Sequence, residues 1–271
     1  MRKGTERGRP VRWQDVAVSW SRYAALGDSF TEGMDDPYDD GVFRGWADLV
    51  AGRLSEVNGP GFAYANLAIR GRLYDAIVTE QVEPALAMKP DLISFAAGAN
   101  DVLRRRCDPP ALMERFEATI MRMRATGADV LMFRFADVMS RLPGNNLVAP
   151  RIRFLNQAAG EVAERTGARL VDLWNDHEYA NPALWSIDRL HMSAAGHRRT
   201  AAHVLAVLGV PADPSWWDVP PRPAVKPWLI ARSDDARWAG RYLAPWIKRR
   251  LTGRSSGDDV RPKRPDMLPL D

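Results

Sequence analysis

The sequence is poor in the residues that bind metals or form disulfides. It has one cysteine, Cys107, and four histidines among 271 residues. A single cysteine forms no intramolecular disulfide, which favours a reducing compartment. No cysteine and histidine group has the spacing of a metal site, so we expect no metal. No stretch of about 18 apolar residues occurs either, so we expect no membrane-spanning helix.

The first residues of the sequence are not expected to form a secretory signal. Residues 1–20 begin with basic side chains, but no apolar run of about 7 to 15 residues follows, as a secretory signal requires. We therefore expect an N-terminal arm over 1–20 and a cytoplasmic protein.

Positive charge is concentrated at the C-terminal end. The net charge is +4, yet residues 220–271 hold 12 basic and 6 acidic residues, and residues 1–219 hold 26 basic and 28 acidic ones. Because a nucleic-acid enzyme places positive charge around its site, we expect no nucleic-acid partner.

The body alternates between two hydrophobic patterns. Short, mostly apolar runs bounded by Gly, Asp or Pro are typical of strands buried on both faces, and longer runs with helical spacing separate them. This alternation predicts a parallel sheet between helical layers. The predicted strands are Arg22–Gly27, Phe62–Leu67, Asp91–Gly98, Ala128–Phe135 and Ala168–Leu173. The predicted helices span about 45–57, 75–88, 110–126, 151–166 and 193–208.

The composition changes beyond residue 210. Ten of the 20 prolines and five of the 10 tryptophans lie in 211–271. We expect a domain over 21–210, then an extension over 211–254 that docks on it with one helix at about 234–251. Residues 255–271 are polar and Pro-rich, which predicts a disordered tail.

Polar residues follow several predicted strands where they end. Ser29 follows the first, Gly71 follows the second and Asn100 follows the third, while Asp188 and His191 come after the fifth. Sites in such sheets form beyond the carboxyl ends of the strands, so these residues are expected at one edge. A neutral imidazole activates a hydroxyl, a carboxylate holds the imidazole, and amide donors stabilise an oxyanion.

These residues resemble the sequence blocks of the SGNH, or GDSL-type, hydrolases. The matching blocks, in family order, are Gly27-Asp28-Ser29-Phe30, Gly71, Gly98-Ala99-Asn100-Asp101 and Asp188-x-x-His191. The resemblance covers about 20–210 and implies a flavodoxin-like three-layer α/β/α sandwich with a five-stranded parallel sheet.

The resemblance also implies the chemistry. Ser29 would be the nucleophile of a serine esterase that cleaves O-acyl esters through an acyl-serine, with His191 as base and Asp188 orienting it. The amides of Ser29 and Gly71 and the side chain of Asn100 would form the oxyanion hole, with no cofactor and no metal. The substrate would be a small-molecule acyl ester. A thioesterase, an acyltransferase or a non-catalytic scaffold protein remains an alternative.

Three further groups of residues are expected to have ordinary structural positions. His197 and His203 are expected at the surface, and the acidic stretch 35–40 is expected to be a solvated turn and not a calcium site. The tryptophans of the extension, at 216, 217, 228 and 238, are expected to dock on the body. The alternative is weak contact of this basic, Trp-rich segment with a membrane surface.

Overall fold

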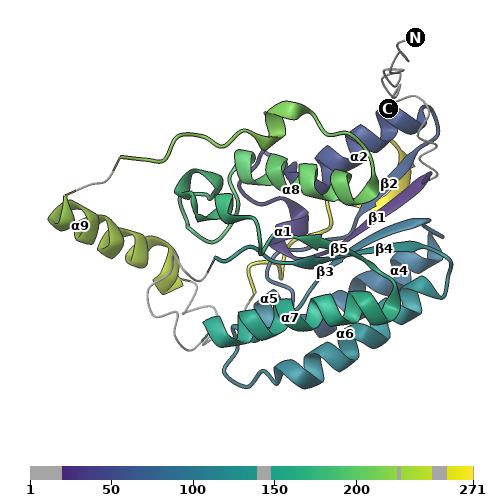
Figure 1. Cartoon of the computed structure of the whole chain (residues 1–271), viewed down its shortest axis with the longest axis horizontal. Coiled ribbons are helices and arrows are strands. Elements are labelled where there is room, and N and C mark those ends of the chain that lie inside the picture. Colours follow the sequence, from purple (N-terminus) through teal and green to yellow (C-terminus); the bar gives the residue numbers. More distant parts are fainter. Residues whose placement is uncertain (1–19, 139–147, 225–226, 246–254, 271) are drawn as a thin grey trace, which may run out of the picture.

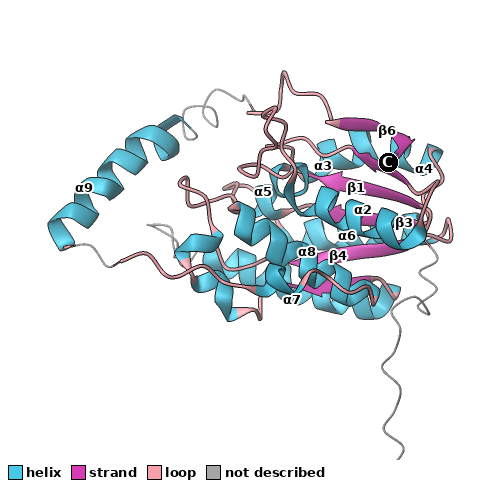
Figure 2. Ribbon diagram, turned by 90° about the horizontal axis from the view of Figure 1, so that it is seen from above, coloured by secondary structure: helices cyan, strands magenta, loops and turns pink. Residues whose placement is uncertain are grey.

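The fold is built around one mixed six-stranded sheet (Figures 1 and 2). It is seen in a computed structural model that describes residues 20–138, 148–224, 227–245 and 255–270. The strand order is β5-β4-β3-β1-β2-β6, and neighbouring strands are parallel except for β6, which is antiparallel to β2. The strands are β1 (Arg22–Gly27), β2 (Ala63–Asn66), β3 (Leu92–Ala96), β4 (Asp129–Arg134), β5 (Arg169–Asp172) and β6 (Arg264–Pro269).

Helices cover both faces of the sheet, as expected for strands that are apolar on both sides. Figure 1 shows α2 and α8 on one face and α6 and α7 on the other. Their bounds are α1 (Ser29–Glu32), α2 (Gly45–Asn58), α3 (Tyr74–Ile77), η2 (Val78–Val82), α4 (Glu83–Ala87), α5 (Ala99–Val102), α6 (Pro109–Arg124), α7 (Ala149–Thr166), α8 (Ala194–Leu208) and α9 (Trp228–Trp238). Short helical turns are η5 (His177–Ala180), η6 (Pro182–Leu184), η7 (Pro214–Trp217) and η8 (Ala239–Leu243).

Each face of the sheet has its own apolar core. Trp46 of α2 and Leu205 of α8 belong to the cluster on one face, and Phe116 of α6 and Leu155 of α7 belong to the cluster on the other. Successive residues of one strand belong to different clusters, for example Ala25 and Leu26 of β1. This two-sided burial explains why the five predicted strands are mostly apolar.

The five parallel strands lie where the sequence predicts them, but the sheet has a sixth. The prediction of a purely parallel, five-stranded sheet is incomplete, and the prediction of disorder over 255–271 is wrong for β6, which adds to the edge of β2. Pro265 and Pro269 made β6 hard to predict, because proline is depleted in strands, although an edge strand tolerates it. Lys263 anchors it, with its Nζ 2.8 Å from Asp48 Oδ1 and 2.6 Å from the carbonyl oxygen of Arg44.

The helix of the extension begins earlier than predicted. The helix predicted at 234–251 begins at Trp228, directly after Pro227, and its predicted end lies outside the described residues. Docking is confirmed for Trp238, which is 8% exposed, and is wrong for Trp228, which is 71% exposed.

Trp216 and Trp217, the other two tryptophans that were expected to dock, lie close to the body. Trp216 packs against the core on the α8 face. Trp217 contacts the ring of His203 on α8, with the ring centroids 4.9 Å apart. Among the described residues, no helix has the length and apolar character that crossing a bilayer requires. The arm over 1–20 lies outside the described residues except for Trp20, and the domain limits and the cytoplasmic location stay predictions.

Candidate active site

The segment after β1 presents Ser29 at the carboxyl edge of the sheet. Gly27 ends the strand, where a Cβ would lie 2.7 Å from the carbonyl oxygen of Ala96, so only glycine allows this turn. Asp28 then caps α1, because its Oδ1 accepts a 3.1 Å hydrogen bond from the N–H of Phe30. Ser29 is therefore the first residue of a short helix that starts beyond the strand.

The structure brings His191 and Asp188 to this serine. His191 Nε2 lies 3.0 Å from Ser29 Oγ, and His191 Nδ1 lies 2.5 Å from Asp188 Oδ2. Asp188 Oδ1 accepts 2.9 Å hydrogen bonds from the backbone N–H groups of Leu190 and His191. With its Nδ1 proton donated to the carboxylate, the imidazole is free to accept the hydroxyl proton at Nε2. The arrangement can activate a hydroxyl by general-base catalysis.

The pKa values of the pair shift in opposite directions. Burial by itself lowers the pKa of His191, but the hydrogen bond and charge of Asp188, aided by Asp35 and Asp28, outweigh it, so the pKa is raised. Burial by itself raises the pKa of Asp188, but its hydrogen bonds and its attraction to His191 lower it overall. Each group therefore favours the charged form of the other, which stabilises an imidazolium formed during a reaction.

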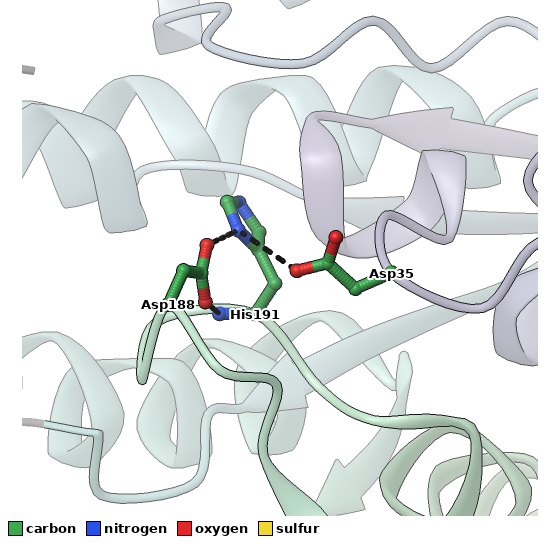
Figure 3. A group of neighbouring side chains, drawn as sticks. All are labelled: Asp35, Asp188 and His191. Atoms are coloured by element: carbon green, nitrogen blue, oxygen red, sulfur yellow. Dashed lines mark hydrogen bonds and ion pairs between the residues drawn. The ribbon is translucent and has the colours of Figure 1, made fainter. Parts of the chain in front are cut away.

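A second carboxylate faces the same imidazole (Figure 3). Asp35 Oδ2 lies 3.9 Å from His191 Nδ1, on the side opposite Asp188. Asp35 has a φ of +68°, which directs the chain after α1 back toward the site. Its neighbour Asp36 is buried and forms a two-fold ion pair with Arg44. The expectation of a solvated turn over 35–40 is therefore wrong for Asp36, whereas Asp35 is partly exposed.

Asp35, Asp188 and His191 also offer the ligand atoms of a small metal site. One oxygen each from Asp35 and Asp188 and one nitrogen of His191 lie within 4.8 Å of one another. The Nδ1 atom, however, makes the 2.5 Å contact with Asp188, and a cation there would have to replace that hydrogen bond. We assign the cluster to the orientation of His191 and assign no metal to it.

Asn100 lies at the site and bonds to Asp28. Its Nδ2 donates to Asp28 Oδ2 at 2.8 Å and to the carbonyl oxygen of Arg72 at 3.1 Å. Burial raises the pKa of Asp28 to about 6, although the Phe30 amide and His191 lower it. The Asn100 side chain thus joins the segments that follow β1, β2 and β3. Its role in an oxyanion hole stays a prediction.

Gly71 follows β2 on the same side, with a φ of +72°. A Cβ at this position would lie 2.4 Å from the Oγ of Ser255 and 2.9 Å from that of Ser256. The segment at 255–258 therefore covers this turn, and Asp258 Oδ1 lies 3.7 Å from Arg72 Nη1. The start of the segment predicted as a disordered tail thus lies against a loop that the sequence predicts to be catalytic.

Two histidines that were expected at the surface lie inside. His197 is 1% exposed; its Nδ1 accepts a 3.3 Å hydrogen bond from the Trp46 N–H, and its Nε2 lies 3.0 Å from the Met34 carbonyl oxygen. His203 is partly buried, with Nε2 2.7 Å from Asp176 Oδ2. The helical spacing of these histidines did not distinguish a solvent face from a buried one, because α8 is buried on most of its circumference.

Sequence reasoning missed two neighbours of the catalytic segment. Asp35 was treated as part of an acidic run, and Trp238 as one of several docking tryptophans. The indole of Trp238 donates a 2.9 Å hydrogen bond to the carbonyl oxygen of Asp188. No sequence signal marks either residue, because each acts through a contact with a segment more than 45 residues away.

Comparisons with known proteins show the family to which this chain belongs. The model of the GDSL-like lipase/acylhydrolase family matches residues 25–199. An acetylxylan esterase from Geobacillus stearothermophilus is 28% identical over 203 residues, which are 68% of this chain and 92% of that protein.

Solved structures show the same fold. A catalytic mutant of an acetylxylan esterase from Geobacillus stearothermophilus superposes with a TM-score of 0.59 at 19% identity, covering 74% of this chain and 97% of the other. A lipase/acylhydrolase from Enterococcus faecalis gives 0.55 at 25% identity, covering 69% and 95%. The family match spans more than half of the chain and includes both Ser29 and His191. The chain therefore belongs to the GDSL-like lipase/acylhydrolase family and is a hydrolase that acts on ester bonds.

Proposed function

We propose that the protein is a serine esterase that cleaves short O-acyl esters through an acyl-serine intermediate. The observation that carries the proposal is the continuous hydrogen-bonded chain from Ser29 Oγ through His191 to Asp188, with distances of 3.0 and 2.5 Å. Ser29 attacks the ester carbonyl while His191 Nε2 takes its proton, and His191 then returns that proton to the departing alcohol. Water attacks the acyl-serine with the same base, releasing the acid and regenerating the hydroxyl.

Asp188 keeps the imidazole in the tautomer that this reaction needs. Its carboxylate accepts the Nδ1 proton, so Nε2 stays available as the acceptor. The two backbone N–H groups on Oδ1 fix the carboxylate in turn. When His191 becomes charged, Asp188 and Asp35 both lie close enough to stabilise it.

The oxyanion is proposed to rest on the amides of Ser29 and Gly71 and on Asn100. All three lie in segments that follow β1, β2 and β3 on one edge of the sheet. Asn100 Nδ2 is engaged with Asp28 and Arg72 in this structure, so its donation to an oxyanion requires that one of these bonds be shared. The removal of one such donor typically costs about 10²–10³ in kcat.

The acyl group is proposed to be acetyl. The support is the relative named as an acetylxylan esterase, which aligns along 92% of its own length. We further propose that the alcohol is a carbohydrate hydroxyl, as the name of that relative indicates for that protein. Thioester cleavage and acyl transfer to another alcohol would use the same Ser29 and His191 and differ only in the leaving group or the acceptor.

The test compares turnover of p-nitrophenyl acetate by the wild type and by the Ser29→Ala variant. We expect a loss in kcat of at least about 10⁴-fold, because the nucleophile is removed. Ser215→Ala, at an exposed position of η7, is the matched control and should retain full activity. A fluorophosphonate probe should label the wild type and not Ser29→Ala. Equal turnover by the wild type and Ser29→Ala would favour a scaffold protein.

A second experiment tests the acyl group and the acceptor. We expect kcat/KM for p-nitrophenyl esters to fall as the acyl chain lengthens from two to twelve carbons, and acetate to be released from acetylated xylo-oligosaccharides. Faster turnover of the long chains would contradict the acetyl proposal. Added alcohols that divert the acyl group from water would identify an acyltransferase, and preference for acetyl thioesters would identify a thioesterase.

A further inference from the structure

Helix α9 of the C-terminal extension contacts the loop that carries Asp188 and His191 through its C-terminal half. Figure 1 shows the helix beginning far from the sheet and running back toward the body. At its far end Trp228 is 71% exposed, whereas Trp238 at its near end is 8% exposed. The Nε1–H of Trp238 donates a 2.9 Å hydrogen bond to the backbone carbonyl oxygen of Asp188. The extension thus binds the main chain of the residue whose carboxylate holds His191.

A second contact joins the helix to the residue after Asp188. The guanidinium of Arg189 lies 2.7 Å from Asp235 Oδ1 and 5.0 Å from the ring centroid of Trp238. Arg189 has a φ of +63°, a conformation that residues other than glycine rarely adopt. Such a conformation persists only where the surroundings hold it, and here Asp235 and Trp238 hold the side chain.

The turn at Arg189 determines how Asp188 and His191 face each other. These two residues are three positions apart, and the backbone N–H of His191 also bonds to Asp188 Oδ1. A change of φ at Arg189 would therefore alter both the backbone bond and the 2.5 Å bond between the side chains. We propose that Trp238, assisted by Asp235, is a positioning residue for the Asp188–His191 pair. This inference rests on the proposed function, and it makes the extension, which lies beyond the family match at 25–199, part of the active site.

The proposal has a signature in pH dependence. The charged and titratable groups that act on His191 are Asp188 in its own loop, Asp35 and Asp28 from the segments around α1, and His197 of α8. The hydrogen bond and charge of Asp188 are the largest influences that raise the pKa of His191. Weakening the hydrogen bond between Asp188 and His191 therefore lowers the pKa of His191. The acid limb of the kcat/KM profile then moves to lower pH, and the plateau of kcat/KM falls.

The experiment uses the full chain with Trp238→Phe, which keeps an aromatic ring for Arg189 and removes the N–H donor. Trp228→Phe, on the exposed end of the same helix, is the matched control. The imidazole resonances, assigned with His191→Asn, give the pKa of His191 by NMR titration, and p-nitrophenyl acetate gives kcat and KM. For Trp238→Phe we expect a lower His191 pKa and a plateau kcat/KM reduced about fivefold, mostly in kcat. Trp228→Phe should match the wild type.

A second variant, Asp235→Asn, tests the same loop without changing the indole and should move the pKa and the plateau in the same direction. The fraction folded is measured by thermal unfolding for every variant. An unchanged His191 pKa in folded Trp238→Phe and Asp235→Asn would overturn the inference, including where activity falls equally at all pH values, because that pattern marks a structural role alone. Absence of Ser29-dependent turnover in the wild type would instead remove the proposed function, while the NMR titration would still decide the positioning role.

Discussion

Asn100 donates a 2.8 Å hydrogen bond to the carboxylate of Asp28, although 72 positions separate the two residues. The bond joins the segment that carries the proposed nucleophile to the segment after β3. The carboxamide also donates to the carbonyl oxygen of Arg72, in the segment after β2. The proposed part of Asn100 in the oxyanion hole can therefore be tested separately from its bond to Asp28.

Asn100→Ala should lower kcat for p-nitrophenyl acetate by about 10²–10³-fold with a small effect on KM, because a donor to the transition state is lost. Asn175→Ala, an exposed asparagine after β5, is the control and should retain activity. The variant Asp28→Asn separates the two roles of Asn100. Should Asp28→Asn reproduce the entire loss, or Asn100→Ala stay within threefold of the wild type, the oxyanion assignment of Asn100 would be wrong.

Gly71→Ala should reduce both stability and activity. The new Cβ would meet Ser255, and the φ of +72° costs a residue with a side chain about 1–2 kcal/mol. Gly209→Ala is a close control, since its φ is +73° and a Cβ there meets no atom within 4 Å. Thermal unfolding should show a loss for both variants, and kcat should fall for Gly71→Ala only. Equal kcat values in the two variants would contradict a role for the Gly71 turn in the reaction.

Asp35→Asn should shift the pH dependence of turnover. Asp35 raises the pKa of His191 from 3.9 Å away, so its neutralisation lowers that pKa. The acid limb of kcat/KM should then move to lower pH, because His191 must be neutral to accept the hydroxyl proton. Asp39→Asn, on the exposed part of the same loop, is the control. An acid limb of kcat/KM at the same pH in Asp35→Asn and the wild type would show that Asp35 does not influence His191.

His197 should make the folded state sensitive to acid. Burial lowers its pKa to about 4, below the ordinary value of 6.5, so the folded state resists protonation that the unfolded state accepts. The stability it contributes is therefore present above pH 6.5 and is lost as the pH falls toward 4, by about 3 kcal/mol in total.

The variant His197→Gln tests this sensitivity, because a neutral side chain with one acceptor and one donor can replace the imidazole between Trp46 and Met34. Urea unfolding of this variant between pH 7 and pH 4 should show a weaker pH dependence than the wild type. His177→Gln, at an exposed turn, is the control. An unchanged slope in His197→Gln would assign the acid sensitivity to other groups.

The alternative expectation for the extension, a weak contact with a membrane surface, is open to a direct test. Trp228, Leu229 and Ile230 are exposed on α9, which is the part of the extension that such a contact would use. Flotation with anionic liposomes should therefore be weakened in a variant with all three changed to serine. Equal flotation of the variant and the wild type would contradict a membrane contact through this face.

The layered α/β architecture and the order of the functional blocks could be predicted from the amino-acid sequence. Strands such as β1 and β3 are mostly apolar, and this local property records burial on both faces of a sheet. Ser29, Asn100 and His191 follow strand ends, and parallel topology then brings those ends to one edge. Patterns within short windows were sufficient for these conclusions.

The contacts that surround this framework could not be predicted from the sequence and are seen in the folded chain. β6 pairs with β2 despite its prolines, Asp35 approaches His191, and Trp238 binds the main chain of Asp188. Each depends on the direction of a side chain or an edge and on segments tens to hundreds of residues apart, which no local periodicity records. Residue types in a sequence therefore predict which chemistry is available, whereas distances of 2.5–4 Å between distant segments arise only once the chain is packed.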